Sequence, residues 1–422
     1  MTTNLASAIQ KLAPSATLAM SQAVRSLRDQ GVDDIIGFDA GQPSFDTPAN
    51  ITAAAVAALR KGDTRYVSAI GIADLRAAIS EKLHVENHIT AHPESVLVTP
   101  GAKCAIFLAF RALLEPGTKA MLLDPAWVSY EPAAKAMGAE VTRIPCSPND
   151  GYQPDPDFIS HYIDSSIRLI VLNSPCNPTG AVYEKERIRR IVSEARAHDI
   201  TVVCDEIYES LIYDGQHYSP ASDFDNVITV NGFSKAFSMT GWRLGYVVGP
   251  KDILDAMQLI LQHSITCVTP FAQAGGVAAL SDRASNELMG KMRDAYKRNR
   301  DLIVETTMRS EHFRCIPPAG TFYAFPSYEI AAASVDVSLA LLHRAHVATV
   351  PGSAFGAVGE GSLRISFAGT YSEVEEGLHR MEAFFSKHSD PEEIKRLART
   401  DPISGKICVS GIRCDADERG LQ

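Results

Sequence analysis

The sequence predicts an α/β protein with a mostly parallel sheet wrapped by helices, and with a smaller α+β domain built from both chain ends. Two observations predict the sheet. Short apolar runs rich in β-branched residues alternate with longer amphipathic segments between about residues 50 and 280. These runs are almost continuously apolar, as expected of strands that helices cover on both faces. A third observation, the mixture of helical and short strand patterns at the two ends, predicts the second domain.

Six strands are expected in the large domain, which we place at residues 46–290. In chain order they are SVLVT (95–99), KAMLLD (119–124), RLIVLN (168–173), ITVVCD (200–205), VITVN (227–231) and LGYVVG (244–249). The segments between them include CAIFLAFRALL (104–114) and EKERIRRIVSEARAHD (184–199), whose apolar residues recur at helical spacing. This alternation is typical of parallel strands joined by helical crossovers.

The small domain is expected to combine residues 1–45 with residues 291–388. Its helical patterns are NLASAIQKL, LAMSQAVRSLRDQG, MRDAYKRNRDLIVETTM and SEVEEGLHRMEAFFSK. Short strands are expected around IIGFDAG, GTFYAFPS, VATVPG and LRISFAG. Residues 389–422 are charged and poor in aromatic residues, which predicts a C-terminal extension formed by a surface helix and a mobile tail.

Composition excludes several classes of function. The chain has 422 residues, of which 45% are hydrophobic and 21% charged, as in ordinary globular proteins. Its formal net charge of -10 disfavours a nucleic-acid partner, and the apolar run at 104–114 is interrupted by Arg111 and too short to span a membrane. The eight cysteines include no C-x-x-C pair, and Cys104, Cys204 and Cys267 lie in apolar surroundings. We therefore expect free thiols, no metal site and a cytoplasmic protein.

Polar residues follow the predicted strands, where open α/β sheets bind their ligands. The turn at Gly101 opens a helix, whose free N–H groups favour an anion such as phosphate. Trp127 offers a flat stacking surface, and the rigid loop SPCNPTG can present the amide of Asn177. Taken singly, a glycine before a helix is more often a simple turn, a lone tryptophan is more often a core residue, and Asn177 can simply cap its loop.

An acid ends the fourth expected strand, and two cations follow the fifth. Asp205 ends a buried strand, so it either caps a helix or faces a cation or a protonated ring nitrogen. The stretch NGFSKAFSMTGWRLGY then supplies Ser234, Lys235 and Arg243. Arginine clamps phosphate, and a lysine held beside it has a lowered pKa and attacks aldehydes, although a lone lysine is usually solvated. Together these groups describe a pocket for one molecule, pyridoxal 5′-phosphate.

The same motifs resemble a known family. SKAFSMTGWRLGY, NSPCNPTG, CDEIYESL, GQPSFDTP, VTPGAK and LRISFA resemble those of the class I, fold type I aminotransferases. The resemblance covers residues 5–388 and is greatest to bacterial aspartate aminotransferases of the branch that contains prephenate-active enzymes. It implies the seven-stranded type of sheet found in fold type I transferases that use pyridoxal phosphate, and a homodimer with shared active sites. RYVSAIG and LQHSITCVTPFAQ depart from the family pattern.

The resemblance also implies a role for each site residue. Lys235 would hold the cofactor aldehyde, Asp205 the ring nitrogen, and Asn177 and Tyr208 the ring hydroxyl, with Trp127 stacked on the ring. The phosphate would be bound by Gly101, Ala102, Ser234, Arg243 and Tyr66 of a second subunit. The substrate α-carboxylate would bind Arg364 beside the backbone of Gly41. Lys103 would bind the distal carboxylate of a dicarboxylic substrate or, alternatively, the cofactor phosphate.

These expectations describe an aminotransferase that moves an amino group from an L-amino acid, aspartate or glutamate, to a 2-oxo acid such as 2-oxoglutarate. Lys235, Asp205 and Tyr208 are the expected catalytic residues. Another reaction on the same cofactor, such as elimination, racemisation or oxidation, would keep nearly all of them, and so would transamination of aromatic or neutral amino acids. A ligand-sensing regulator is disfavoured, because the residues before the motifs leave no room for a DNA-binding module.

Overall fold

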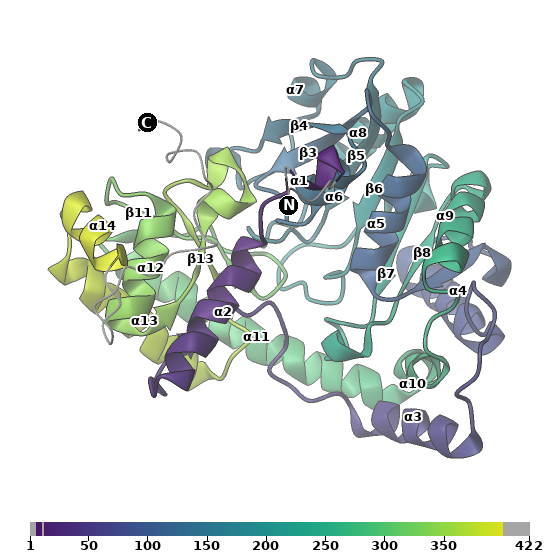
Figure 1. Cartoon of the computed structure of the whole chain (residues 1–422), viewed down its shortest axis with the longest axis horizontal. Helices are drawn as coiled ribbons and strands as arrows, with labels where there is room; N and C mark the ends of the chain where they lie inside the picture. The colour runs from purple at the N-terminus through teal and green to yellow at the C-terminus, as the bar shows by residue number, and fades with distance from the viewer. Residues whose placement is uncertain (1–5, 11, 400–422) are drawn as a thin grey trace, which may run out of the picture.

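The computed structural model describes residues 6–10 and 12–399. Its large domain is built on a seven-stranded sheet with the order β2-β8-β7-β6-β5-β3-β4 (Figure 1). These strands are β2 (Val96–Thr99), β3 (Lys119–Asp124), β4 (Glu140–Pro145), β5 (Ile167–Asn173), β6 (Thr201–Asp205), β7 (Val227–Gly232) and β8 (Gly245–Val248). Strand β8 runs antiparallel to β2 and β7, and the other neighbours pair in parallel. The mostly parallel sheet predicted from the sequence is confirmed.

The six expected strands correspond to β2, β3, β5, β6, β7 and β8, whereas β4 was not identified. Strand β4 lies at the edge of the sheet, pairs only with β3, and buries little beyond Ile144. Its sequence, EVTRIP, therefore lacks the continuous apolar run that marks a central strand. An edge strand needs fewer apolar residues, and this is why the pattern missed it.

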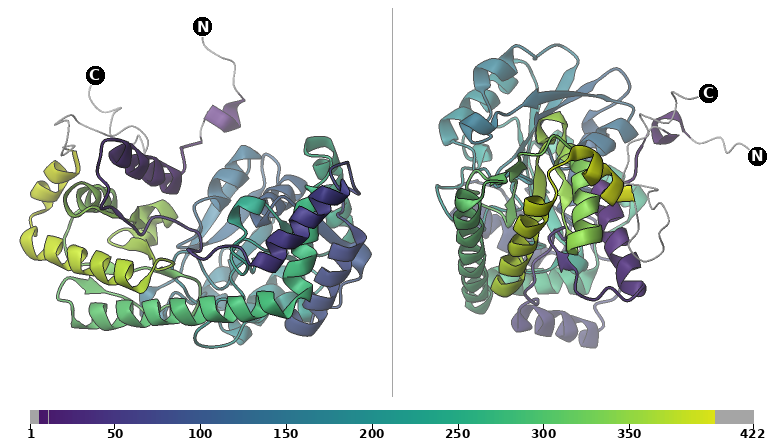
Figure 2. Two further views of the ribbon diagram at one scale, coloured as in Figure 1. Left: turned by 90° about the horizontal axis from the view of Figure 1, so that it is seen from below. Right: turned by 90° about the vertical axis from the view of Figure 1, so that its left-hand side faces the viewer.

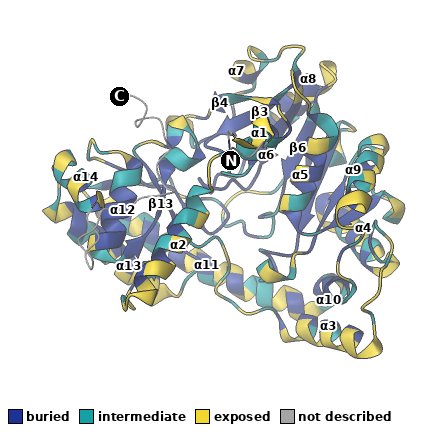
Figure 3. Cartoon of the chain, viewed as in Figure 1, coloured by how far each residue is buried: buried dark blue, intermediate teal, exposed yellow. Residues whose placement is uncertain are grey.

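Helices cover both faces of the sheet, so most residues of its strands other than the edge strand β4 are buried (Figure 3). Alternate residues of the strands point to opposite faces. Leu122, Val171 and Val203 share a core with α5 (Ala102–Leu113), α6 (Tyr130–Ala136) and α9 (Lys251–Ser264). Their neighbours in sequence pack instead against α7 (Pro156–Ser160) and α8 (Lys185–Ala197). Around β2 and β8 a further core contains residues of α3 (Ala49–Lys61), α4 (Ala73–Asn87) and α10 (Pro270–Ser281).

The two ends of the chain meet in a smaller unit. Strand β1 (Ile36–Gly37) pairs in parallel with β12 (Val347–Ala348), and β10 (Tyr323–Ala324), β14 (Leu363–Ser366) and β13 (Val350–Pro351) form a small sheet. The short pair β9 (Phe313–Arg314) and β11 (Ser327–Tyr328) lies near them. The helices of this unit are α2 (Ala16–Asp29), α12 (Ser334–Ala345), α13 (Tyr371–Lys387) and α14 (Pro391–Arg399). The short α1 (Ser7–Gln10) precedes them.

One long helix, α11 (Arg283–Arg309), runs along both units (Figure 2). The boundary placed at residues 290 and 291 falls inside this helix, so the chain passes from one unit to the other without a linker. Helix α14 packs on α12 and buries Ile394 and Ala398. The predicted mobile tail, from residue 400 onward, lies outside the described residues. In the part of the chain that the structure describes, no helix has the length and apolarity needed to cross a membrane.

Candidate active site

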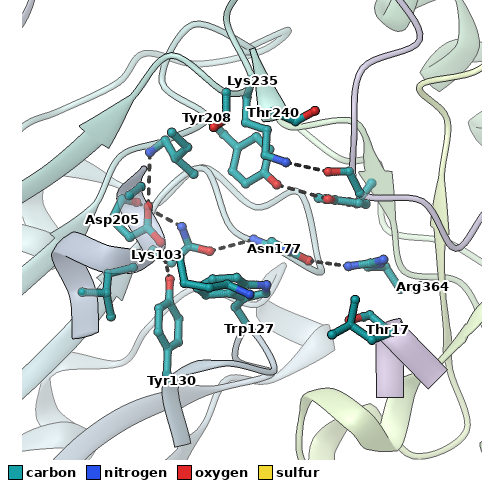
Figure 4. A pocket seen from close by; sticks show the side chains of 18 of the residues that line it. Thr17, Lys103, Trp127, Tyr130, Asn177, Asp205, Tyr208, Lys235, Thr240 and Arg364 are labelled. Carbon is teal, nitrogen blue, oxygen red and sulfur yellow. Dashed lines mark hydrogen bonds between the residues drawn. The ribbon is translucent and has the colours of Figure 1, made fainter. Parts of the chain in front are cut away.

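A cavity of about 520 Å³ lies at the carboxyl ends of the central strands (Figure 4). Eleven of the residues singled out from the sequence line it: Gly41, Ala102, Lys103, Trp127, Asn177, Asp205, Tyr208, Ser234, Lys235, Arg243 and Arg364. Gly41 and Arg364 come from the small unit and the others from the large one, so the cavity lies between the two. Gly101 is adjacent to Ala102, whereas Tyr66 does not line the cavity.

Lys235 follows the end of β7 and extends its amine into the cavity (Figure 4). Its Nζ donates to the carbonyl of Gly41 at 2.5 Å. The pKa of Lys235 is lowered to about 7, mainly by burial and also by the positive charges of Arg364 and Arg243. The sequence predicted a lowered pKa from the neighbouring arginine, and burial proves to be the larger cause. Near neutral pH much of this amine is therefore uncharged and nucleophilic.

Asp205 is the last residue of β6, and only 4% of its surface is exposed. The hydroxyl of Tyr130 donates to its Oδ2 at 2.7 Å, and the N–H of Ile207 donates to Oδ1 at 3.3 Å. Burial raises the pKa of Asp205 to about 6, although these hydrogen bonds oppose it. The segment after Asp205 is a turn, so the alternative that this residue caps a helix does not hold.

Two asparagines connect Asp205 to the arginine of the small unit. The side-chain amide of Asn173 donates to the main-chain carbonyl of Asp205 at 3.0 Å, and its carbonyl accepts from the N–H of Asn177 at 2.8 Å. The side-chain carbonyl of Asn177 accepts from Arg364 at 3.3 Å. Because that oxygen is engaged, the NH₂ group of Asn177 is left to donate to a ligand.

Arg364 lies in β14 and is 2% exposed. Its Nη2 donates to the carbonyl of Asp39 at 2.8 Å, and its guanidinium lies 4.4 Å from the centre of the Tyr323 ring and 5.2 Å from that of Phe355. Its buried Nε has no hydrogen-bond partner among the described residues. A buried guanidinium held by neutral groups and lining a cavity is suited to bind a carboxylate from outside the chain.

The turn before α5 and the loop after β7 meet at the end of the cavity. Gly101 has φ 82°, and a Cβ at this position would lie 2.5 Å from Nη2 of Arg243. Arg243 donates to the carbonyl of Thr240 at 2.9 Å, while Ser234 is buried beside it in the cavity lining. Because Ala102 begins α5, the free N–H groups of that helix, a hydroxyl and a guanidinium converge. Such a group is a typical binding site for phosphate.

Lys103 and Trp127 lie against each other on one side of the cavity (Figure 4). The Nζ of Lys103 is 4.9 Å from the centre of the Trp127 ring. Burial lowers the pKa of Lys103, and Arg243 lowers it further. Tyr66 is 85% exposed, so a contact with a cofactor would require a second subunit.

Comparison with known proteins identifies the family. The family model described as aminotransferase class I and II matches residues 33–381. The chain belongs to this family. This aminotransferase is 40% identical to a probable aspartate/prephenate aminotransferase of Aquifex aeolicus, over 90% of this chain and 98% of the relative. It is also 40% identical to the aspartate/prephenate aminotransferase of Thermus thermophilus, over 88% of this chain and 96% of the relative.

Solved structures agree with this assignment. An aspartate aminotransferase from Thermus thermophilus with maleate matches the aminotransferase with a TM-score of 0.87 at 38% identity, covering 90% of this chain and 99% of that one. An aromatic aminotransferase from Pyrococcus horikoshii matches with a TM-score of 0.82 at 39% identity, covering 87% and 99%. The resemblance inferred from the motifs and the predicted fold class are confirmed.

Sequence reasoning did not identify several residues that line the cavity of this aminotransferase, among them Thr17, Ser21, Tyr130, Asn173, Thr240 and Tyr323. Tyr130 stands three residues after Trp127 in PAWVSY, and Tyr323 lies in GTFYAF, where its hydroxyl accepts from Tyr208 at 3.1 Å. In the sequence, PAWVSY indicated only the stacking residue Trp127, and GTFYAF indicated only a short strand. Thr17 and Ser21 lie on α2 and follow no strand, so a search for polar residues after strands does not find them.

Behind the turn that follows Asp205, the aminotransferase buries a second group of polar side chains. One carboxylate oxygen each of Glu206 and Glu209 and one ring nitrogen of His217 lie within 4.8 Å of one another. Lys82 contacts Glu209, and His217 lies 3.0 Å from Glu206. Burial lowers the pKa of His217, but the two carboxylates outweigh burial and raise it overall. Lys82 and His217 thus supply the positive charge that these carboxylates need.

Proposed function

We propose that this aminotransferase uses pyridoxal 5′-phosphate to move the α-amino group of L-aspartate or L-glutamate to a 2-oxo acid such as 2-oxoglutarate. One observation carries the proposal: an amine with its pKa lowered to about 7 and a carboxyl with its pKa raised to about 6 line the same cavity. The phosphate-type turn at Gly101 and Arg243 ends that cavity. A purely structural lysine would gain nothing from this placement.

The residues fit the cofactor in charge and in shape. Gly101 leaves room that a Cβ would fill, so the guanidinium of Arg243 can approach the first turn of α5. With Ala102 and Ser234, this group would hold the phosphate. Asp205 would hold the protonated ring nitrogen, and the NH₂ group of Asn177 would donate to the ring hydroxyl together with Tyr208. Trp127 would cover the ring.

The chemistry divides between the cofactor and the chain. When bound, pyridoxal phosphate supplies an aldehyde for the amino group and a ring that accepts the electron pair of the substrate Cα. The Nζ of Lys235 would take the proton from the substrate Cα and deliver it to the carbon that carried the cofactor aldehyde, and in the second half of the reaction it would make the same transfer in reverse. Its lowered pKa suits both tasks near neutral pH, because the uncharged and the charged amine are then both populated. Asp205 keeps the proton on the ring nitrogen.

Two cations support an acidic substrate. Arg364 would bind the α-carboxylate, because its Nε has no hydrogen-bond partner among the described residues and its Nη atoms donate to Asn177 and Asp39, which fix the guanidinium in place. Lys103 would bind the distal carboxylate, since it lines the same cavity as Arg364 and lies beside Trp127. Relatives named aspartate and aspartate/prephenate aminotransferases support this assignment. Relatives named for aromatic amino acids make neutral substrates the second candidate.

The active unit in this proposal is a cytoplasmic homodimer. The ring of Tyr66 is almost fully exposed in a single chain, which suits a residue that completes the phosphate site of a second subunit. The six cysteines in the described part of the chain are free, as expected in a reducing compartment.

A panel of amino acids tests the proposed activity. The purified protein is loaded with pyridoxal phosphate and incubated with each amino acid in turn and 2-oxoglutarate, or with oxaloacetate when glutamate is the donor, and the oxo acid formed is measured. We expect oxaloacetate from aspartate at the highest kcat/KM, and none with Lys235→Ala. Faster turnover of aromatic amino acids would move the assignment to the second candidate. Absence of any oxo acid would contradict the proposal.

A further inference from the structure

We propose that Tyr130 is a positioning residue that keeps the Asp205 carboxylate ionised and oriented toward the ring nitrogen of the cofactor. The inference rests on the proposed role of Asp205, and it assigns a task to a side chain that the sequence motifs did not single out. In this inference Tyr130 contacts Asp205 and acts on the cofactor only through that carboxylate.

The hydrogen bond between Tyr130 and Asp205 is buried, and the Tyr130 ring that makes it is held in place by packing. Tyr130 is the first residue of α6 and is 2% exposed, and its hydroxyl lies 2.7 Å from Oδ2 of Asp205. The ring of Trp127 packs edge to face against that of Tyr130, with centres 5.2 Å apart and planes at 79°. Trp127 thus limits rotation of the phenol, and the cofactor stacked on Trp127 would share the same scaffold.

The direction of the hydrogen bond gives it a chemical effect. Burial raises the pKa of Tyr130 well above its usual value, and the nearby charge of Asp205 raises it further, so the phenol keeps its proton and acts as the donor. A donor bound to a carboxylate favours the ionised form. An ionised Asp205 leaves the proton on the cofactor nitrogen, where it is needed, whereas a protonated Asp205 would take it away.

Other groups face Asp205 without replacing this donor. Lys235 favours the ionised form, but much of its amine is uncharged near neutral pH, and Glu206 disfavours it. Burial raises the pKa values of the remaining neighbours, which are therefore neutral: Tyr208, Cys176 and Cys204. The N–H of Ile207 is the second donor to the carboxylate, at a longer 3.3 Å. Without Tyr130, the carboxylate would keep only this weaker bond.

Nuclear magnetic resonance of the cofactor ring nitrogen tests this inference. Protein is loaded with pyridoxal phosphate labelled with ¹⁵N in the ring, and the ¹⁵N chemical shift at pH 8 reports whether that nitrogen carries a proton. We expect a protonated nitrogen in the wild type and a shift toward the unprotonated value in Tyr130→Phe. The same variant should lose about 10- to 100-fold in kcat, as expected for one hydrogen bond to a charged group.

Tyr183→Phe is the matched control, because Tyr183 is buried beside Cys176 but makes no hydrogen bond to Asp205. Its ¹⁵N signal should stay at the wild-type position. An unchanged signal in Tyr130→Phe would overturn the inference, whereas an unprotonated nitrogen in the wild type would instead overturn the proposed role of Asp205.

A ring-fluorinated tyrosine at position 130 keeps the size of the side chain and strengthens the donor, so it tests the inference even if Tyr130→Phe does not fold. In protein free of cofactor, ¹³C-labelled aspartate reports the pKa of Asp205, assigned with Asp205→Asn. We expect the fluorinated variant to lower this pKa relative to the wild type. A pKa that does not move would show that the hydroxyl only fills space.

Discussion

Two side chains of the cavity have pKa values that move toward neutrality from opposite directions. Burial lowers the pKa of the Lys235 amine to about 7 and raises that of the Asp205 carboxyl to about 6. A general base works best when its pKa lies near the working pH, because the correct protonation state and the driving force are then both present. The two residues are separated along the chain, so folding alone creates this pair.

The pKa of Lys235 predicts how capture of the cofactor depends on pH. An amine is nucleophilic only when uncharged, so a pKa lowered to about 7 makes the rate of capture rise with pH through about 7 and level off above it. Growth of the near-visible absorption band after mixing with pyridoxal phosphate measures this rate. N-acetyl-lysine in the same buffers is the reference, and Lys235→Ala is the blank. A rate that continues to rise toward the pKa of an ordinary lysine would contradict the prediction.

In our proposal, Lys103 determines the preference for an acidic substrate. If its amine binds the distal carboxylate, Lys103→Ala should lower kcat/KM for aspartate by about 2–5 kcal/mol in transition-state stabilisation and leave alanine or phenylalanine little changed. Steady-state kinetics with the three donors measures the difference. Equal losses on all donors, together with weaker cofactor binding, would assign Lys103 to the phosphate instead.

The sequence could identify residues that follow strands, but not those that contact them from elsewhere. Asp205 was found because it ends an apolar run, and Asn177 and Lys235 because they lie in the loops that follow such runs, although Asn173, which also ends a run, was missed. Tyr130 lies 75 residues before its partner Asp205, and nothing in PAWVSY indicates which side chain its hydroxyl meets. Thr17 reaches the cavity from a helix near the start of the chain. Such contacts depend on packing, which local patterns do not encode.

At the scale of elements, the turn between β2 and α5 brings backbone and guanidinium together. Gly101 adopts φ 82°, and the space of its missing Cβ is taken by Arg243. Gly101→Ala should therefore weaken cofactor binding by at least about tenfold, since it puts a side chain on a backbone with positive φ and displaces Arg243. Titration of the cofactor-free protein with pyridoxal phosphate measures this loss.

Gly117→Ala separates the two effects. Gly117 has a similar φ of 91° in the turn after α5, and a Cβ there would meet nothing within 4 Å. It should cost stability but leave cofactor affinity unchanged. If both variants bind the cofactor as the wild type does, the turn at Gly101 does not serve the phosphate.

The elements themselves were predictable in proportion to their burial. Strands β3, β5, β6 and β7 are buried on both faces and stand out as continuous apolar runs. The edge strand β4 did not, and neither did the start of α11, because this helix continues through Gly290 across the expected domain boundary. Boundaries between domains follow from contacts in space, and a continuous helix hides them.

At the scale of the whole molecule, the cavity needs both units of one chain and, in our proposal, a second chain. The small unit brings Arg364 and Gly41 to the strand ends of the large unit. Tyr66 remains outside the cavity of its own chain. A shared site of this kind can be tested by mixing subunits that are inactive for different reasons.

Hybrids of Lys235→Ala with Tyr66→Phe should regain activity if the latter is inactive alone. Each mixed dimer has one site with an intact Lys235 and an intact Tyr66 from its neighbour, so random mixing should restore up to about a quarter of wild-type turnover. Mixing Lys235→Ala with Arg364→Ala is the control. Both residues serve the site of the same subunit, so these hybrids should stay inactive. No recovery in the first mixture, or an active monomer, would contradict the shared site.

The most direct test of the central claim is a half-reaction without an acceptor. Protein loaded with pyridoxal phosphate is mixed with excess L-aspartate, and both the absorption band and the oxaloacetate released are followed. An aminotransferase stops after one oxo acid per active site, because the amino group stays on the enzyme, and adding 2-oxoglutarate restores the band and releases glutamate. We predict this stoichiometry. Continued release of oxo acid together with ammonia and no acceptor would show elimination or oxidation instead and would contradict the assignment as an aminotransferase.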